Sequence, residues 1–438
     1  MKKRERGFVI SWYYPPGNSS EGLVTFKLLG HSKYFYDVWT RANQWQNVWD
    51  RKSDERELVA KNVRTIENDC SSMEKWVKNG LEYFTQHRDE YDFIMSRSMP
   101  AESHELAIKI KERFPDIKWV ASFGDPIVNT PYIDAITMNG ENNPFRVREY
   151  LRREKLSIPR TAKLILSPVR NAKSYLWQRD KQVGEKEAKK LRTINNNVLQ
   201  KADVLIYNNE YQYEHAFSDI KLKKYKNKGR ILEHSFDADL YSIEQKLKND
   251  KLTFIYVGHL DDTRNANSLF RAILHLKKKD ADLDKKVSFD FYGHLSEKNK
   301  LYVLEHRLTD VIKIHEDVGY LESLKIIKSA DWAILIDANF TGLVDDCIYL
   351  PAKLMDYIGA RTKVFSISHV KGAGSDIIRD VGGGKVVTHN ADDIYLYLSK
   401  IIYKGYSPVP YDEKKVQQYS AKEIAKKLDC IEDELMEN

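Results

Sequence analysis

The stretch Leu252-Thr-Phe-Ile-Tyr-Val-Gly-His-Leu-Asp-Asp-Thr-Arg264 decides the fold that this sequence predicts. A short run of apolar, aromatic and β-branched residues ends at Gly258, where the backbone can turn. The segment 265–276 follows, with its apolar residues at three- and four-residue spacing, as on one face of a helix. A buried strand, a glycine turn and an amphipathic helix are the first unit of a Rossmann-like domain.

The same alternation of strand and helix extends over most of the chain. In the second half the predicted strands are 253–257, 287–292, 332–336, 363–367 and 385–387. In the first half they are 8–11, 34–40, 92–96, 119–123 and 204–207. Strands separated by helical segments indicate parallel sheets that are covered on both faces. The predicted fold class is α/β, with two Rossmann-like, doubly wound parallel-sheet domains facing a cleft.

The length and the polar segments indicate where these domains begin and end. A chain of 438 residues is too long for one ordinary core. The polar segment 236–251 lies before the strand that restarts the pattern, so we place the hinge there. We therefore predict an N-terminal domain over 1–236 and a C-terminal domain over 237–410. A helix over 411–438 is expected to pack back toward the N-terminal domain.

The composition limits the class of protein and its partners. With 42% hydrophobic and 31% charged residues, it is typical of a soluble globular protein. Three widely spaced cysteines suggest neither a disulfide framework nor a zinc site, and we expect a cytoplasmic protein. The net charge of +7 is modest, and no nucleic-acid-binding signature accompanies it. The lysine-rich segment 221–230 could contact anionic lipid or an acidic substrate, or be a solvated surface.

The loop after the strand 253–257 carries the strongest candidate site. His259 and Arg264 are two cationic or potentially cationic side chains in a loop that leads into a helix. Free N–H groups at a helix N-terminus favour anions, and an arginine adds a permanent charge. We predict a diphosphate site here, with Gly258 as its turn. The alternative is a surface loop with an incidental arginine and histidine.

A second candidate group follows the strand 332–336. Lys353 and Asp356 lie three residues apart on a predicted helix, after Asp345 and Asp346. The ammonium could bind phosphate, and a carboxylate could bind paired sugar hydroxyls. The alternative is an exposed salt bridge within one helix.

The N-terminal half contributes three further candidate groups. Gly17, Asn18 and Gly22 lie between the first strand and the first helix, where the backbone could approach a ligand. His104 follows the strand 92–96 and is predicted at the edge of the cleft, where it could contact a sugar hydroxyl. Asp125 follows the strand 119–123 and could face an acceptor. The alternatives are a helix-cap neighbour for His104 and a turn carboxylate for Asp125.

Together these segments resemble retaining GT-B glycosyltransferases of family four, also called glycosyl transferases group 1. Val257-Gly-His-Leu-x-x-x-Arg264 resembles that family's "VGRL…K" loop, which implies that His259 and Arg264 hold the donor diphosphate. The segment 318–331 is similar to the family's "G…L…Y..AD" segment, which implies that Tyr320 and Leu321 meet the nucleobase.

The resemblance continues on both sides of this core. Leu350-Pro-Ala-Lys-Leu-Met-Asp-Tyr-Ile-Gly359 resembles the variant "LPSKLFEYLA", which implies that Asp356 binds the ribose hydroxyls. The first glutamate of the family's pair falls at Ile348, so Asp345 or Asp346 would have to replace it. The segment 14–22 is similar to the family's "PP..GG" loop, and His104 to the family's N-domain histidine.

The resemblance implies transfer of a sugar from a nucleoside-diphosphate sugar to an acceptor hydroxyl with retention, in cell-surface polysaccharide or glycoconjugate synthesis. On this interpretation His104, His259 and Arg264 are catalytic, the C-terminal domain binds the donor, and no metal or cofactor is required. The acceptor would be a saccharide or a lipid-linked sugar, reached by peripheral contact with the inner face of the membrane.

Three rival functions remain on this evidence. A nucleotide-sugar epimerase would use a similar two-domain clamp. A non-catalytic nucleotide-sugar-binding partner would explain the missing glutamate at Ile348. A nicotinamide oxidoreductase is disfavoured, because no G-x-G-x-x-G follows a predicted strand.

Overall fold

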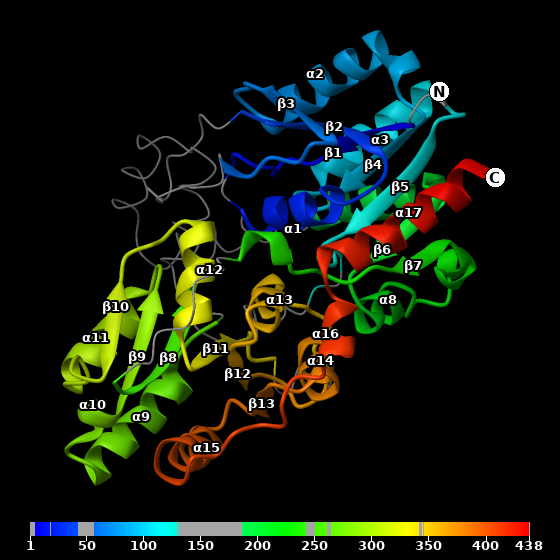
Figure 1. The fold of residues 1–438 in the computed structure, drawn as a ribbon. Coiled ribbons are helices and arrows are strands. Elements are labelled where there is room, and N and C mark those ends of the chain that lie inside the picture. The colour runs from blue at the N-terminus through cyan, green and yellow to red at the C-terminus, as the bar shows by residue number, and fades with distance from the viewer. Residues whose placement is uncertain are drawn as a thin grey trace, which may run out of the picture.

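The computed structural model describes residues 5–17, 19–42, 57–128, 130, 186–241, 250–260, 264–340, 344 and 346–437. In this part of the chain, two parallel β-sheets form two domains, with helices around each sheet (Figure 1). The first sheet has the order β3-β2-β1-β4-β5-β6-β7 and the second the order β10-β9-β8-β11-β12-β13. The predicted fold class is therefore confirmed.

The strands of the first sheet are β1 (Arg6–Ile10), β2 (Phe35–Arg41), β3 (Val63–Asn68), β4 (Phe93–Arg97), β5 (Lys118–Phe123), β6 (Val204–Tyr207) and β7 (Gly229–Ile231). Those of the second are β8 (Leu252–Val257), β9 (Val287–Tyr292), β10 (Ile312–His315), β11 (Trp332–Ile336), β12 (Lys363–Ile367) and β13 (Gly384–Val387). The chain thus passes from one sheet to the other between Ile231 and Leu252.

The helices with bounds in the N-terminal half are α1 (Ser20–Leu29), α2 (Met73–Gln86), α3 (Glu102–Arg113) and α8 (Glu210–Ala216), with the short turns η3 (Arg88–Glu90), η4 (Lys223–Lys228) and η5 (Ala238–Leu240). Those of the C-terminal half are α9 (Asn267–Lys279), α10 (Leu283–Lys286), α11 (Glu297–Glu305), α12 (Tyr320–Ser329), α13 (Ala352–Gly359), α14 (Ala373–Val381), α15 (Ala391–Lys404), α16 (Glu413–Gln417) and α17 (Ala421–Glu437). No helix in the described ranges is long and apolar enough to cross a bilayer.

All ten predicted strands are present, with ends that differ by one or two residues. The prediction missed β3, β7 and β10, which are edge strands of the two sheets. An edge strand has one unpaired side and carries polar residues, so its sequence lacks the continuous apolar run of a central strand. In β3, Arg64 and Glu67 are exposed, and in β10 Lys313 is exposed beside the buried Ile312.

The strand order reverses between β1 and β4 in the first sheet and between β8 and β11 in the second. In doubly wound sheets, ligands bind outside the carboxyl ends of the strands at such a reversal. The segments that follow β1 and β8 are α1 and the loop from Gly258 to Arg264. The topology therefore directs attention to these two segments.

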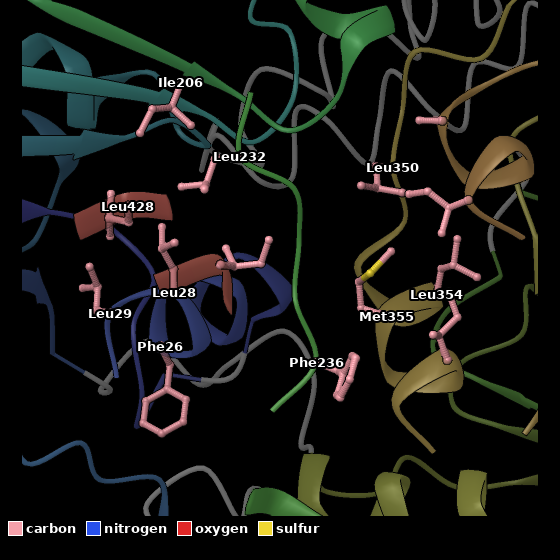
Figure 2. Close-up of a cluster of buried hydrophobic side chains, with 14 of the residues drawn as sticks. Phe26, Leu28, Leu29, Ile206, Leu232, Phe236, Leu350, Leu354, Met355 and Leu428 are labelled. Atoms are coloured by element: carbon pink, nitrogen blue, oxygen red, sulfur yellow. The ribbon is translucent and has the colours of Figure 1, made fainter. Parts of the chain in front are cut away.

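One cluster of buried apolar side chains extends across both domains. Figure 2 shows Leu28 and Leu29 on α1 near Leu428 on α17, and Leu354 and Met355 on α13 across from them. The C-terminal helix α17 packs against α1 of the first domain. Apolar packing of this kind fixes the orientation of α1, whose other face reaches the space between the sheets.

Candidate functional site

A cavity of about 390 Å³ is lined by residues of both domains. From the first domain, α1 contributes Ser20, Glu21, Leu23 and Lys27, the segment after β5 contributes Asp125, and the segment after β7 contributes His234. From the second domain come residues that follow β8, β10 and β11, together with the beginning of α13. The predicted site residues that line this cavity are Asp125, Gly258, His259, Arg264, Tyr320, Lys353 and Asp356.

Gly258 and Lys353 fit together at the carboxyl end of β8. The Lys353 ammonium donates to the Val257 carbonyl oxygen at 2.9 Å and to the Tyr256 hydroxyl at 3.0 Å. Gly258 has φ +122°, and a Cβ on it would lie 2.7 Å from Lys353 Nζ. Any larger residue would be strained and would displace the ammonium. Glycine is therefore required here for both backbone and cavity.

The charge of Lys353 depends on its surroundings. Burial, and secondarily the nearby Arg264, lower the pKa of this ammonium to about 7, while Asp337 and Asp356 act in the opposite sense. Two cationic groups side by side in a buried place repel each other until an anion arrives. An anion bound between Arg264 and Lys353 would favour the protonated lysine, as a diphosphate does.

Two carboxylates that the sequence analysis did not select orient this cationic group. Asp317 lies 3.1 Å from Nε2 of His259, so this ring nitrogen carries the proton and donates to the carboxylate. Asp337, at the end of β11, is buried and accepts a hydrogen bond of 2.6 Å from the Ser368 hydroxyl. Burial raises the pKa of Asp337, and the Ser368 hydrogen bond and Arg264 oppose this rise. Neither aspartate stands in a local motif that would have revealed it.

Asp356 has a different neighbour from the one its helix suggests. Its carboxylate oxygen Oδ1 accepts from Lys27 of α1 at 3.0 Å and from the Tyr320 hydroxyl at 2.9 Å. Lys353 donates elsewhere, so these bonds do not form the intrahelical salt bridge considered as the alternative. The carboxylate thus joins α1, α12 and α13, and a ribose at Asp356 would share it with Lys27.

The N-terminal wall of the cavity carries carboxylates. Glu21 stands in the first turn of α1 and Asp125 follows β5, and both line the cavity. Burial raises the pKa of Glu21 to about 7, with Arg97 opposing and Asp125 adding to the rise. Burial also raises the pKa of Asp125, and Arg264 of the other domain lowers it. The cavity therefore has a cationic wall formed by the β8 loop and α13 and an acidic wall formed by α1 and the β5 loop.

His104 does not lie at the edge of the cleft, contrary to the prediction. It is fully buried, and its Nδ1 lies 2.7 Å from the Ser96 hydroxyl, which itself accepts from Trp119. Burial, with Arg97 as a second cause, lowers the pKa of His104 to about 3. A neutral imidazole inside the first domain cannot reach a sugar in the cavity. The physical reason is that His104 lies on the apolar face of α3, together with Ala107 and Ile108.

Five other predicted residues do not line the cavity. Gly22 packs against the backbone of Tyr14, where a Cβ would lie 3.2 Å from that Cα, and Gly17 closes a turn onto the Tyr14 carbonyl. Leu321 packs against the apolar cluster, and Asp346 forms an ion pair with Lys371 at 2.8 Å. Asn18, like Asp345, lies outside the described residues.

One group of side chains in the described ranges has the spacing of metal ligands, and it lies outside the cavity lining. His31, Asp237 and Asp239 offer ligand atoms within 4.8 Å of one another. The Asp237 carboxylate accepts from His31 at 3.0 Å, and Asp239 forms an ion pair with Lys422 at 3.1 Å. These bonds account for the group as an ion-pair network near the junction of the domains.

The two-domain arrangement is shared with solved structures of known proteins. An alpha,alpha-trehalose-phosphate synthase (UDP-forming) from Burkholderia xenovorans has a TM-score of 0.57 at 10% identity, over 99% of each chain. The lipopolysaccharide outer core galactosyltransferase WaaB has a TM-score of 0.55 at 10% identity, over 98% of this chain and 99% of its own. A UDP-N-acetylglucosamine 2-epimerase has a TM-score of 0.53 at 10% identity, over 100% of this chain and 96% of its own.

These similarities establish the fold, which is the GT-B arrangement of two facing Rossmann-like domains. No family model matches the chain, and no curated protein matches it in sequence.

Proposed function

We propose that this chain is a glycosyltransferase of the family-four type, which transfers a sugar from a nucleoside-diphosphate sugar to an acceptor hydroxyl with retention. The observation that carries the proposal is the cationic wall of the cavity. Arg264, Lys353 and the His259–Asp317 pair follow strands of the second sheet and line one space. Fixed cationic donors beside a helix N-terminus are suited to a diphosphate.

The chief chemical task in such a transfer is to stabilise the departing diphosphate. Arg264 supplies a permanent charge, and Lys353 supplies a second one when the diphosphate favours its protonated form. His259 donates a hydrogen bond through its ring and is oriented by Asp317. Groups that are already in place when charge develops contribute most to the rate, and the loss of one donor typically costs about 10²–10³-fold.

The nucleoside end of the donor would lie toward α12 and α13. Tyr320 and Asp356 line this part of the cavity and are hydrogen-bonded to each other. The ribose hydroxyls can donate to the Asp356 carboxylate beside Lys27. We propose no metal, since the charge of the diphosphate is matched by these side chains.

The acceptor is a saccharide or a lipid-linked sugar in this proposal, and the protein would act in the cytoplasm in peripheral contact with the inner face of the membrane, in polysaccharide or glycoconjugate synthesis. The lysine-rich segment 221–230 supports this contact in part. Lys221, Lys223 and Lys224 are exposed, whereas Lys226 pairs with Glu214 at 2.7 Å. Three exposed ammonium groups would attract anionic lipid.

The test begins with nucleotide binding. Thermal unfolding is measured with UDP, GDP, ADP and TDP, since a ligand of the native state raises its stability by RT ln(1 + [L]/Kd). The matching nucleotide sugars are then incubated with the protein, and nucleoside diphosphate release and sugar products are followed. Diphosphate release with transfer supports the proposal. An isomerised nucleotide sugar without release would identify an epimerase, and binding without turnover would identify a non-catalytic partner.

A further inference from the structure

The acidic wall of the cavity contains a carboxylate that the proposed donor contacts leave unused. Glu21 is the second residue of α1 and lines the cavity. Its carboxylate lies over Gly124, where a Cβ would come within 2.7 Å of Oε2. The glycine thus leaves the space that the carboxylate occupies. Glu21 is held in this position by the shape of the β5 loop.

A buried arginine holds the Glu21 carboxylate from behind. The Arg97 guanidinium donates to the Ser122 hydroxyl at 2.7 Å and to the Thr25 hydroxyl at 3.2 Å. Its third contact, with Glu21 Oε2, is longer, at 3.4 Å. Because Arg97 is itself buried and fixed by two hydroxyls, it orients Glu21 without satisfying both carboxylate oxygens. One face of the carboxylate is left for a hydroxyl donor in the cavity.

The other charges around Glu21 set its proton affinity. Burial raises the pKa of Glu21 to about 7, the Arg97 charge lowers it, and the Asp125 charge raises it. Asp125 in turn is influenced by Arg264 across the cavity. A carboxylate with a pKa near neutrality can both accept a proton and release it to water at physiological pH.

We propose that Glu21 is the proton acceptor for the acceptor hydroxyl, and that Arg97 is its positioning residue. This inference rests on the proposed glycosyl transfer. The acceptor oxygen forms a bond to the anomeric carbon, the bond from that carbon to the diphosphate oxygen breaks, and the diphosphate leaves with the electron pair. The hydroxyl proton passes to a Glu21 carboxylate oxygen and afterwards to solvent. Glu21 contacts only the acceptor oxygen, so the face of attack is set by the orientation of the donor.

The experiment compares Glu21→Gln with a matched control. Glu74 stands in the first turn of α2 and is exposed, so Glu74→Gln makes the same change at an equivalent helix position outside the cavity. Release of nucleoside diphosphate is measured with the nucleotide sugar that the wild type consumes, with water as the acceptor. We expect Glu21→Gln to lower kcat by about 10²–10⁴-fold, and Glu74→Gln to leave it unchanged.

Two further readouts separate proton transfer from a structural role. In the wild type kcat should rise with pH through about 7, as Glu21 ionises, and this rise should be absent in Glu21→Gln. Glu21→Asp keeps a carboxylate and should recover part of the rate together with the pH dependence. Binding of the nucleoside diphosphate should stay within about two-fold of wild type in all three variants, since Glu21 contacts only the acceptor.

The outcomes distinguish the two proposals. A kcat for Glu21→Gln within about three-fold of wild type, with the pH dependence intact, would overturn the role of Glu21 and leave the proposed transfer standing. If the wild type binds no nucleoside diphosphate and consumes no nucleotide sugar, the proposed function itself fails.

Discussion

Lys27 of α1 and Asp356 of α13 form a buried ion pair between the two domains, with Nζ 3.0 Å from Oδ1. Only 2% of the lysine side chain and 10% of the aspartate side chain are exposed. Asp356 also accepts from Tyr320, so one carboxylate links α1, α12 and α13. This contact holds the first helix of one domain against the nucleoside end of the proposed donor site in the other.

Lys27→Met should therefore destabilise the protein, because it leaves a buried carboxylate with Tyr320 alone. We expect a loss of about 3 kcal/mol in the free energy of unfolding, measured by chemical denaturation. Lys27→Met combined with Asp356→Asn should recover part of this loss, because the uncompensated charge is removed. A loss for the single variant below about 1 kcal/mol would show that the pair does not hold the domains together.

Arg264→Ala should lower turnover of the nucleotide sugar by about 10²–10³-fold and leave the fold intact, because it removes one donor to the departing diphosphate. Turnover is measured as nucleoside diphosphate release, and the fold by thermal unfolding. Lys278→Ala removes an exposed cation from α9, the helix that follows this loop, and serves as the control. Wild-type turnover by Arg264→Ala would remove this residue from the site.

Nucleotide binding should take up a proton above neutral pH. The pKa of Lys353 is lowered to about 7, so at pH 8.5 the lysine of the free protein is mostly neutral, whereas a diphosphate favours its ammonium form. The phosphate groups are fully ionised there, as their second pKa is about 6. Affinity should consequently fall as the pH rises above about 7. Calorimetry in two buffers of different ionisation enthalpy measures this proton.

Lys353→Met should abolish the proton uptake and weaken nucleotide binding. The same lysine affects folding stability with a definite sign. Between about pH 7 and the pKa of an unfolded lysine, near 10.4, the unfolded chain binds more protons, so the contribution of Lys353 to stability increases with pH. Proton uptake that is identical in the wild type and in Lys353→Met would contradict the assignment.

Gly258→Ala tests the shape of the proposed diphosphate site. Gly258 and Gly405 both have positive φ, of 122° and 64°, but only a Cβ at Gly258 meets a side chain, at 2.7 Å from Lys353 Nζ. Both alanine variants should lose about 1–2 kcal/mol of stability from backbone strain. We expect only Gly258→Ala to lose nucleotide binding in a thermal-shift assay. Equal binding by the two variants would argue against a role of Lys353.

The sequence reveals the central strands of this fold because they are buried on both faces and read as apolar runs. Ile334 and Ile255, on strands paired in the middle of the second sheet, belong to such runs. The edge strand β10 has the sequence Ile-Lys-Ile-His with two exposed residues, and only its pairing with β9 defines it. Edge strands are therefore beyond local periodicity.

The candidate site divides in a similar way. Gly258, His259 and Arg264 follow a recognisable strand, so their place at the cavity could be predicted from one segment. Glu21 and Lys27 gain their meaning only from residues of distant segments, Arg97 and Asp356. Lys27 did leave a signal, since it interrupts the apolar run Leu-Val-Thr-Phe-Lys-Leu-Leu of α1. A charged residue in such a run has a buried partner elsewhere in the chain.

His104 illustrates the opposite error. Its place after β4 suggested the cleft, while its helical position pointed inward. Ala107 and Ile108, three and four residues further on, are both buried in α3. A histidine on the apolar face of a helix lies in the core when its neighbours at this spacing do. Periodicity within the helix was the better guide.

The measurement that tests the central claim most directly is a crystal structure of the protein with the nucleoside diphosphate that stabilises it most. The account predicts the diphosphate in the cavity between the domains, with its oxygens about 2.7–3.2 Å from the nitrogens of Arg264 and Lys353. A nucleotide bound elsewhere, or a diphosphate that contacts neither residue, would contradict it.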